Sequence, residues 1–237
     1  MLKLLNKNST IRSVFVLGST SEVSIAICKD LVNSGCKEFH LLSRNRSSNQ
    51  LLVSYLESRA NVKITIEEID LEDINNPKEV MIYKDYDLYI LMAGYLPSKK
   101  EDLTLKEIKK TMEINFIGLI PWLNFITSYK RISKPGRLWV FSSVAGDIGR
   151  PSNFQYGAAK AALTTYCEGL IAKCNNSQFS IRLIKGGIFK TRMSIGIYPN
   201  FLTISPKKIS RILLKNINKK GVEYIPWWWF YLMNIIR

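Results

Sequence analysis

The residues with the clearest chemical potential lie at positions 156–160, where the sequence reads Tyr-Gly-Ala-Ala-Lys. On a helix, this spacing puts the phenol of Tyr156 and the ammonium of Lys160 on one face. A phenol has an ordinary pKa of about 10 and is a poor acid–base catalyst at neutral pH, whereas a neighbouring cation lowers that pKa by stabilising the phenolate. The pair therefore predicts proton transfer at a substrate oxygen.

A serine upstream strengthens this prediction, because a lone Tyr-x-x-x-Lys pair is commonly a surface pair. Ser143 lies thirteen positions before Tyr156 and ends the apolar run that begins at Val140. Open α/β sheets bind ligands at the carboxyl ends of their parallel strands. A serine at such an end can hydrogen-bond the same substrate oxygen as Tyr156. We therefore expect Ser143, Tyr156 and Lys160 to converge on one site.

The elements that must position these residues follow from the hydrophobic pattern. Short apolar runs alternate with longer helical patterns, which predicts βαβ units and a parallel sheet covered on both faces. We expect an α/β fold, a Rossmann-type doubly wound sheet of about seven strands, in a single domain over residues 1–225, followed by an aromatic, basic segment at 226–237. The predicted strands are Ser13–Leu17, Glu38–Leu42, Lys63–Glu67, Leu88–Met92, Arg137–Phe141, Ile181–Ile184 and Val222–Ile225. The predicted helices are Val23–Asn33, Ser48–Ser58, Leu105–Asn115, Gly118–Lys130, Phe154–Ala172 and Pro206–Asn216.

The first strand runs into a turn that opens a helix, which is where such a sheet can hold a dinucleotide. Backbone N–H groups and the helix dipole at this turn predict a pyrophosphate site. At the end of the second strand, Arg44 and Arg46 can pair with a 2′-phosphate, whereas an acidic residue there would select a 2′-hydroxyl. We therefore expect NADP(H), with NAD(H) as the alternative. The candidate contacts are Gly18, Thr20, Ser21, Glu22, Val23, Arg44, Asp70, Leu71, Ala93 and Gly94.

Composition argues against several other kinds of site. The single histidine, His40, lies inside an apolar run that predicts a strand, so we expect neither a Ser-His-Asp triad nor a zinc site, and no metal. The four cysteines, Cys28, Cys36, Cys167 and Cys174, lack Cys-x-x-Cys spacing and are expected to be buried free thiols. The N-terminal ten residues lack the apolar stretch of a secretory signal, which predicts a cytoplasmic protein.

Taken together, these motifs resemble the short-chain dehydrogenase/reductase family over nearly the whole chain. The matching pieces are Gly18 with its helix, Asp70, Asn115 in Met-Glu-Ile-Asn-Phe-Ile-Gly, Ser142–Gly146, Tyr156 with Lys160, and Gly187 with Thr191. The resemblance implies an NAD(P)-dependent oxidoreductase that acts on CH-OH or C=O groups.

The resemblance also implies a role for each residue. Tyr156 would exchange the proton, Ser143 would orient the carbonyl, and Lys160 would hold the nicotinamide ribose and tune Tyr156. Asn115 would support a water relay to Lys160, with a helix kink as its structural alternative. Gly187 belongs to the motif in which Ile188 and Thr191 would contact the nicotinamide carboxamide, with a helix N-cap as the alternative for Thr191.

Three departures from the family pattern concern the cofactor site more than the chemistry. Glu22 and Ser24 stand where the family usually has glycines, so Glu22 either adds an anion near the pyrophosphate or favours the helix N-terminus while pointing away. Leu91–Gly94 replaces the usual Asn-Asn-Ala-Gly, and Gly186-Gly187 replaces the usual Pro-Gly.

Four segments are similar to one branch of the family, the decaprenylphosphoryl-2-keto-ribose reductases, whose substrate is a pentofuranosid-2-ulose. These segments are Gly18–Val23, Gly149–Gly157, Lys190–Ser194 and the C-terminal residues. The branch implies reduction of the 2-keto group of a polyprenylphosphoryl pentose in cell-envelope polysaccharide biosynthesis, with a partner flavin oxidase. The alternatives are a soluble carbonyl or 3-oxoacyl reductase, and a catalytically inactive nucleotide-sensing scaffold. Retention of the Ser143, Tyr156 and Lys160 set argues against the scaffold.

The surface charge and the C-terminus leave further alternatives open. The net charge of +15 would attract an anionic membrane surface, unless it reflects a chain rich in Lys, Asn and Ile throughout. The segment Ile225–Arg237 is too short to span a bilayer, and its aromatic cluster suits the inner face of the cytoplasmic membrane, a pocket lid or an oligomer interface. We expect a homodimer or homotetramer, formed through helices such as Phe154–Ala172, and no nucleic-acid partner.

Overall fold

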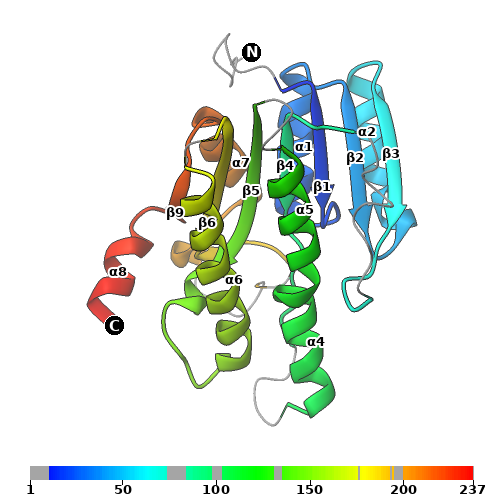
Figure 1. Ribbon diagram of the computed structural model, residues 1–237. Helices are drawn as coiled ribbons and strands as arrows, with labels where there is room; N and C mark the ends of the chain where they lie inside the picture. Colours follow the sequence, from blue (N-terminus) through cyan, green and yellow to red (C-terminus); the bar gives the residue numbers. More distant parts are fainter. Residues whose placement is uncertain are drawn as a thin grey trace.

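Seven parallel strands in the order β3-β2-β1-β4-β5-β6-β9 form the central sheet (Figure 1). The computed structural model describes residues 11–73, 84–97, 103–130, 135–175, 177–192, 194 and 200–236. The strands are β1 Ser13–Leu17, β2 Glu38–Ser43, β3 Lys63–Glu68, β4 Leu88–Leu91, β5 Gly136–Ser143, β6 Phe179–Gly186 and β9 Gly221–Ile225. This topology confirms the predicted single-domain, doubly wound α/β fold.

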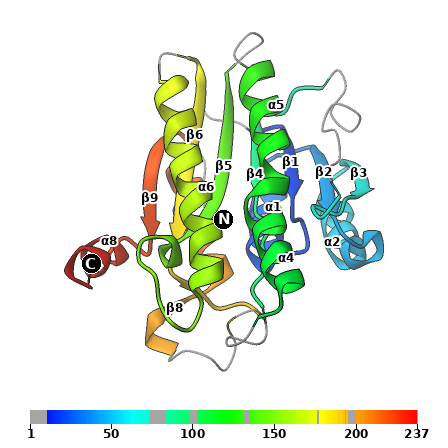
Figure 2. The same ribbon diagram turned by 60° about the horizontal axis from the view of Figure 1, so that its bottom comes forward.

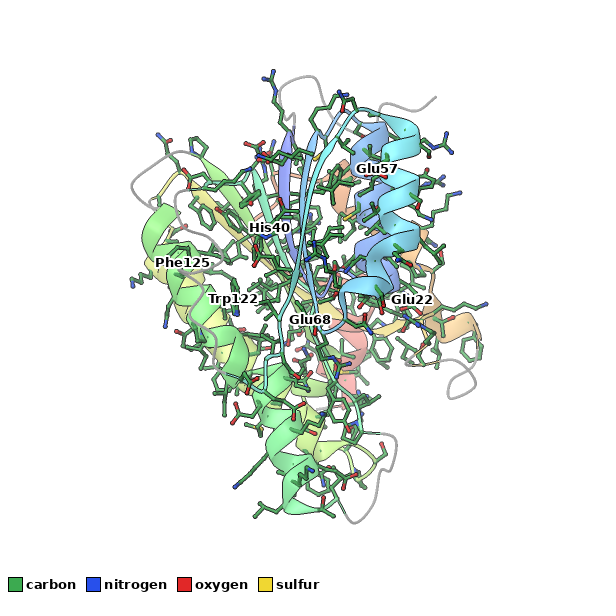
Figure 3. All side chains as sticks on the ribbon, turned by 90° about the vertical axis from the view of Figure 1, so that its right-hand side faces the viewer. Glu22, His40, Glu57, Glu68, Trp122 and Phe125 are labelled. Atoms are coloured by element: carbon green, nitrogen blue, oxygen red, sulfur yellow. The ribbon has the colours of Figure 1, made fainter. Side chains whose placement is uncertain are left out.

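Helices cover both faces of the sheet, as Figure 3 shows with the sheet edge-on: Trp122 and Phe125 lie on α5 on one side, and Glu57 lies on α2 on the other. The helices are α1 Glu22–Asn33, α2 Gln50–Arg59, α4 Leu105–Asn115, α5 Ile120–Lys130, α6 Phe154–Lys173, α7 Pro206–Lys215 and α8 Trp229–Ile236. Among the described residues, no helix is long and apolar enough to cross a bilayer.

The buried strands explain why the two faces form together. In β1, Val14 and Val16 pack into the cluster that contains α1, α2 and α7, whereas Phe15 and Leu17 pack into the cluster under α4, α5 and α6. All five residues of β1 are buried. A strand covered on both faces reads as a continuous apolar run because neither set of alternating side chains reaches water.

The structure differs from the predicted boundaries mainly at the ends of elements. α5 begins at Ile120 instead of Gly118, because a short 3-10 turn at Ile117–Leu119 precedes it and Pro121 suits the first helical turn. β5 and β6 both extend further toward the carboxyl edge than predicted, and β6 ends at Gly186. A small two-stranded sheet of β7 (Ile188–Phe189) and β8 (Thr203–Ile204) was not predicted.

The C-terminal aromatic segment forms α8, which lies beyond β9 at one edge of the sheet (Figure 2). A buried arginine holds the strand that leads into it: the Arg182 guanidinium in β6 donates to Glu223 of β9 at 2.7 Å and to Leu213 O of α7 at 3.0 Å. This side chain is fully buried and therefore ties two strands and a helix together. The N-terminal ten residues, Met193 and Arg237, which the sequence analysis used, lie outside the described residues.

Candidate active site

A cavity of about 410 Å³ opens at the carboxyl edge of the sheet, where β1 and β4 lie side by side and the chain turns to opposite sides. Such a switch point leaves a crevice between the loops that follow neighbouring strands. Every predicted catalytic or cofactor-binding residue except Asn115 and Arg46 lines this cavity. Residues from six separate loops or strand ends, distant in sequence, are therefore brought to one place.

The turn after β1 is built around Gly18, whose φ of +89° favours glycine. A Cβ at this position would lie 2.7 Å from the backbone N of Ala93, so the turn and the loop after β4 approach more closely than any side chain allows. Ser21 caps α1 by accepting from Val23 N at 3.3 Å. The N-terminus of α1 thus opens toward the cavity, where its N–H groups can hold a phosphate group.

The catalytic candidates are positioned by the packing of α6 against β5. Ser142 Oγ donates to Lys160 O at 3.0 Å and shares a 2.8 Å hydrogen bond with Thr164 Oγ1. Gly157 faces the turn after β5, and a Cβ there would lie 2.6 Å from Ala145 O. Because both contacts leave no space for adjustment, the position of Tyr156 on α6 is set relative to Ser143 at the end of β5.

The side chain of Ser143 is oriented by the same turn. Its Oγ accepts a hydrogen bond from Ala145 N at 3.1 Å. Accepting this bond leaves the hydroxyl hydrogen for donation to a substrate oxygen. The Nζ atom of Lys160 lies 5.8 Å from the Tyr156 ring centroid, with the two residues on one face of α6 as their spacing predicts.

Lys160 is almost completely buried, with 3% of its surface exposed. Its ammonium donates to Phe141 O at 3.2 Å. Burial lowers the pKa of Lys160 to about 8. A cation at this depth is costly unless a partner balances it, and perturbed groups of this kind mark functional sites.

Asn115 lies beside the cavity and hydrogen-bonds a loop that forms its wall. It is fully buried at the end of α4, where its Oδ1 accepts from Tyr95 N at 3.1 Å and its Nδ2 donates to Tyr95 O and Thr111 O. A Cβ on Gly94 would lie 3.3 Å from this Oδ1 and 3.8 Å from Lys160 Nζ. Asn115 therefore fixes the loop after β4 next to the Lys160 ammonium.

Glu22 points across the cavity mouth toward Arg192. Its Oε1 accepts from Arg192 N at 2.9 Å and from Arg192 Nε at 3.1 Å. Burial raises the pKa of Glu22, but the hydrogen bonds from Arg192 outweigh it and the net shift is downward. Of the two orientations considered for Glu22, the one that faces the cavity is observed, and Arg192 balances its charge.

The two arginines after β2 differ in position. Arg44 is exposed and lines the cavity, whereas Arg46 begins a 3-10 turn that leads into α2 and does not line it. Instead, Arg46 N donates to Glu68 at 3.3 Å. Of these two arginines, Arg44 alone is therefore placed to meet a phosphate in the cavity.

Sequence reasoning missed several polar residues that line the same cavity, among them Arg150, Asn153 and Trp229. Arg150 and Asn153 lie in the turn before α6, and their closeness to Tyr156 in the sequence could have indicated that they reach the cavity. Trp229 lies on α8, and only the suggestion that the C-terminal segment covers the pocket pointed to it. All four cysteines are buried and form no disulfide, as predicted. The described residues contain no cluster of three or more His, Cys, Asp or Glu side chains that could hold a metal ion.

Comparisons with known proteins agree with this geometry. Residues 12–200 match the family model of the short chain dehydrogenases. An uncharacterised oxidoreductase of Mycobacterium tuberculosis is 30% identical over 114 residues, which cover 48% of this chain and 46% of that protein. The match thus spans less than half of that relative.

Solved structures of low sequence identity share the fold. A 3-oxoacyl-[acyl-carrier protein] reductase of Brucella melitensis superposes with a TM-score of 0.78 at 16% identity, covering 94% of this chain and 92% of that one. A short chain dehydrogenase of Burkholderia cenocepacia in complex with NADP gives 0.77 at 17% identity, covering 94% and 89%. The chain belongs to the short-chain dehydrogenase family, a class of NAD(P)-dependent oxidoreductases.

The buried ammonium gives a prediction about stability. Because the folded-state pKa of Lys160 is about 8 and its ordinary value is 10.5, the unfolded chain holds a proton that the folded chain releases between these pH values. The cost of burying the charge is therefore complete below pH 8 and fades as the pH rises toward 10.5. We expect Lys160→Met to raise the free energy of unfolding at pH 7 by about 2 kcal/mol, with the gain shrinking above pH 8.

Urea unfolding at pH 7 and at pH 10 measures this difference. Lys173→Met, at the exposed end of the same helix, is the matched control and should change the free energy little at either pH. A Lys160→Met protein that is less stable than the wild type at pH 7 would contradict the prediction.

Proposed function

We propose that this protein reduces a ketone to a secondary alcohol with a nicotinamide dinucleotide. The observation that carries the proposal is the convergence of Ser143, Tyr156 and Lys160 on a cavity whose wall also includes the tight turn at Gly18. The residues fit the cofactor, because the glycine turn, the open N-terminus of α1 and the strand ends at Arg44 and Asp70 line one continuous cavity. Together they suit a pyrophosphate, a ribose and an adenine.

Each residue then has a distinct task. When bound, the reduced nicotinamide supplies a hydride to the carbonyl carbon. The Tyr156 phenol donates its proton to the carbonyl oxygen, and the Ser143 hydroxyl donates a hydrogen bond to the same oxygen as charge develops on it. The Lys160 ammonium favours the phenolate that remains, because the two groups are neighbours on α6.

A variant of Tyr156 tests the proposed proton donor. Tyr156→Phe removes the acidic proton and keeps the ring, so we expect kcat for ketone reduction to fall by about 10²- to 10⁴-fold. Dinucleotide affinity, measured by nicotinamide fluorescence, should stay within a few-fold of the wild type. Tyr166→Phe, further along the same helix, is the matched control. Full activity of Tyr156→Phe on every ketone tried would exclude this mechanism.

The proposed cofactor is NADPH in preference to NADH. Arg44 supports this choice, because it is the basic residue that lines the cavity at the end of β2, where a Rossmann-type fold meets the adenosine ribose. A guanidinium pairs well with a 2′-phosphate through charge-assisted hydrogen bonds.

Substitution of Arg44 should shift this preference. We expect Arg44→Ser to raise the Kd for NADPH by about tenfold or more and to leave the Kd for NADH within about twofold, since the lost contact involves the 2′-phosphate alone. Calorimetric titration with both dinucleotides measures the shift. Arg46→Ser, two residues along and outside the cavity, is the control. An equal loss for both cofactors would contradict the assignment.

We propose that the substrate is a polyprenylphosphoryl pentose with a ketone at C2, bound at a membrane surface. We also propose that a flavin oxidase supplies this ketone and that the protein forms a homo-oligomer. The support is α8. Its buried residues Trp229 and Met233 pack against Val144 beside the cavity, whereas Trp227, Tyr231 and Ile235 are 71%, 59% and 80% exposed. One short segment thus lies between the cavity and an exposed apolar surface, which suits an interfacial position.

Point variants test this surface, because a deletion would also remove Trp229 from the cavity wall. We expect the wild type to sediment with anionic phosphatidylglycerol vesicles, and the double variant Trp227→Ser with Ile235→Ser to lose most of this binding, because it buries less apolar area. A Leu51→Ser variant, whose leucine is also exposed but lies on α2, is the control. Unchanged vesicle binding by the double variant would contradict the membrane proposal, and turnover of 3-oxoacyl thioesters without any lipid-linked ketone would favour the alternative reductase.

A further inference from the structure

Part of the cavity wall carries polar groups that the proton-transfer set does not use. Arg150, Asn153 and Trp229 line the cavity together with Tyr156. They come from two elements: the turn before α6 supplies the first two, and α8 supplies the third. Arg150 Nη2 reaches Met233 Sδ on α8 at 3.4 Å, so the turn and the helix meet at this wall.

Asn153 stands at the N-cap position of α6 but does not cap it. An asparagine there usually accepts a hydrogen bond from the second or third helical N–H group. In this chain the side chain makes no capping bond, and its Oδ1 is buried with no hydrogen-bond partner among the described residues. A buried amide oxygen without a donor is costly, which indicates that the oxygen serves another donor.

Trp229 carries the complementary group. Its side chain is 5% exposed, and its indole Nε1 is buried without a hydrogen-bond partner in the described part of the chain. Buried indole N–H groups usually find an acceptor. The indole reaches this place because Gly187 has no side chain: a Cβ there would lie 1.9 Å from Nε1. The Trp229 donor therefore lies against the strand end that leads to Ile188.

The cavity wall thus offers an acceptor, a donor and a cation, and we propose that these three residues form a subsite for a hydroxylated ketone with an anionic substituent. A hydroxyl both donates and accepts, so a polyol can satisfy the Asn153 oxygen and the Trp229 N–H group. A phosphate ester suits the Arg150 guanidinium, which binds such groups in a charge-assisted way. The subsite rests on the proposed ketone reduction and specifies its substrate class as a phosphorylated keto sugar.

An apolar ketone would leave this wall unsatisfied. Burial of the Asn153 oxygen and the Trp229 N–H group against hydrocarbon forfeits a hydrogen bond at each. Sites built to bind hydroxyl groups reject analogues that lack them for this reason. Discrimination by the subsite should therefore depend on the hydroxyls and the phosphate separately.

Three soluble ketones separate these contributions: 2-pentanone, D-ribulose and D-ribulose 5-phosphate. They share a five-carbon chain with a ketone at C2 and add first the hydroxyls and then the phosphate. Reduction with NADPH would be followed for the full-length wild type and for Trp229→Phe, Asn153→Ala and Arg150→Met. Trp228→Phe, the neighbouring indole outside the cavity lining, is the matched control.

We expect kcat/KM in the wild type to rise from 2-pentanone to ribulose and again to its phosphate. Trp229→Phe and Asn153→Ala should each lower the ratio of kcat/KM for either sugar to kcat/KM for 2-pentanone by about tenfold, because they remove one hydrogen bond each. Arg150→Met should lower the ratio of kcat/KM for ribulose 5-phosphate to kcat/KM for ribulose by at least about tenfold. Trp228→Phe should leave all three within about twofold.

Two outcomes would overturn the subsite: an equal loss for all three ketones in each variant, which indicates a packing role, or no loss for either sugar. Binding of ribulose 5-phosphate to the Tyr156→Phe protein, measured by calorimetry with the oxidised cofactor present, tests the subsite without turnover. If the wild type reduces no ketone but this binding depends on Arg150 and Trp229, the proposed reduction fails and the subsite stands. If ketones are reduced and no such dependence exists, the subsite alone fails.

Discussion

The buried ammonium of Lys160 is the constraint on which the site depends. A charge at this depth must be held by fixed partners, and here the partners are the carbonyl of Phe141, at the end of β5, and the neighbouring phenol of Tyr156. The spacing along α6 supplies the phenol, whereas the carbonyl requires α6 to lie close against β5, which the small Gly157 and the Ser142 hydrogen bond permit. The same close packing brings the Ser143 hydroxyl to the cavity. The proposed catalytic set is therefore a product of one helix–strand contact.

At the mouth of the cavity, near the N-terminus of α1, an ion pair replaces the single buried cation found at Lys160. Glu22 places a carboxylate at the mouth, where a phosphate group would be repelled, and Arg192 neutralises it through two hydrogen bonds to one oxygen. These residues are 170 positions apart and join the turn after β1 to the loop after β7. An ion pair at this place repels an anion in the cavity less than the lone carboxylate of Glu22 would.

Most of the fold could be predicted from the sequence because both faces of the sheet are buried. Strands such as β1 are continuous apolar runs, and α1 and α7 carry their apolar residues on one face, so their positions follow from local periodicity. The Tyr156 and Lys160 pair could be predicted because its spacing is local to one helix. The role of Asn153 could not, since an asparagine before a helix reads as a cap and only the folded chain shows that its oxygen is left without a partner. Trp229 reaches the cavity through the placement of α8, which no local pattern specifies.

The contact between Gly187 and Trp229 restricts how the substrate wall can change. The indole occupies the volume that any side chain at position 187 would need, so no side chain can be added at 187 while Trp229 keeps its position. A smaller residue at 229 would release that volume and make larger residues at 187 tolerable, which means that the effect of a substitution at one position depends on the residue at the other. Sequence divergence across this wall should therefore proceed in one order, with position 229 changing first. Libraries that vary the two positions together would reach substrate preferences that single substitutions cannot.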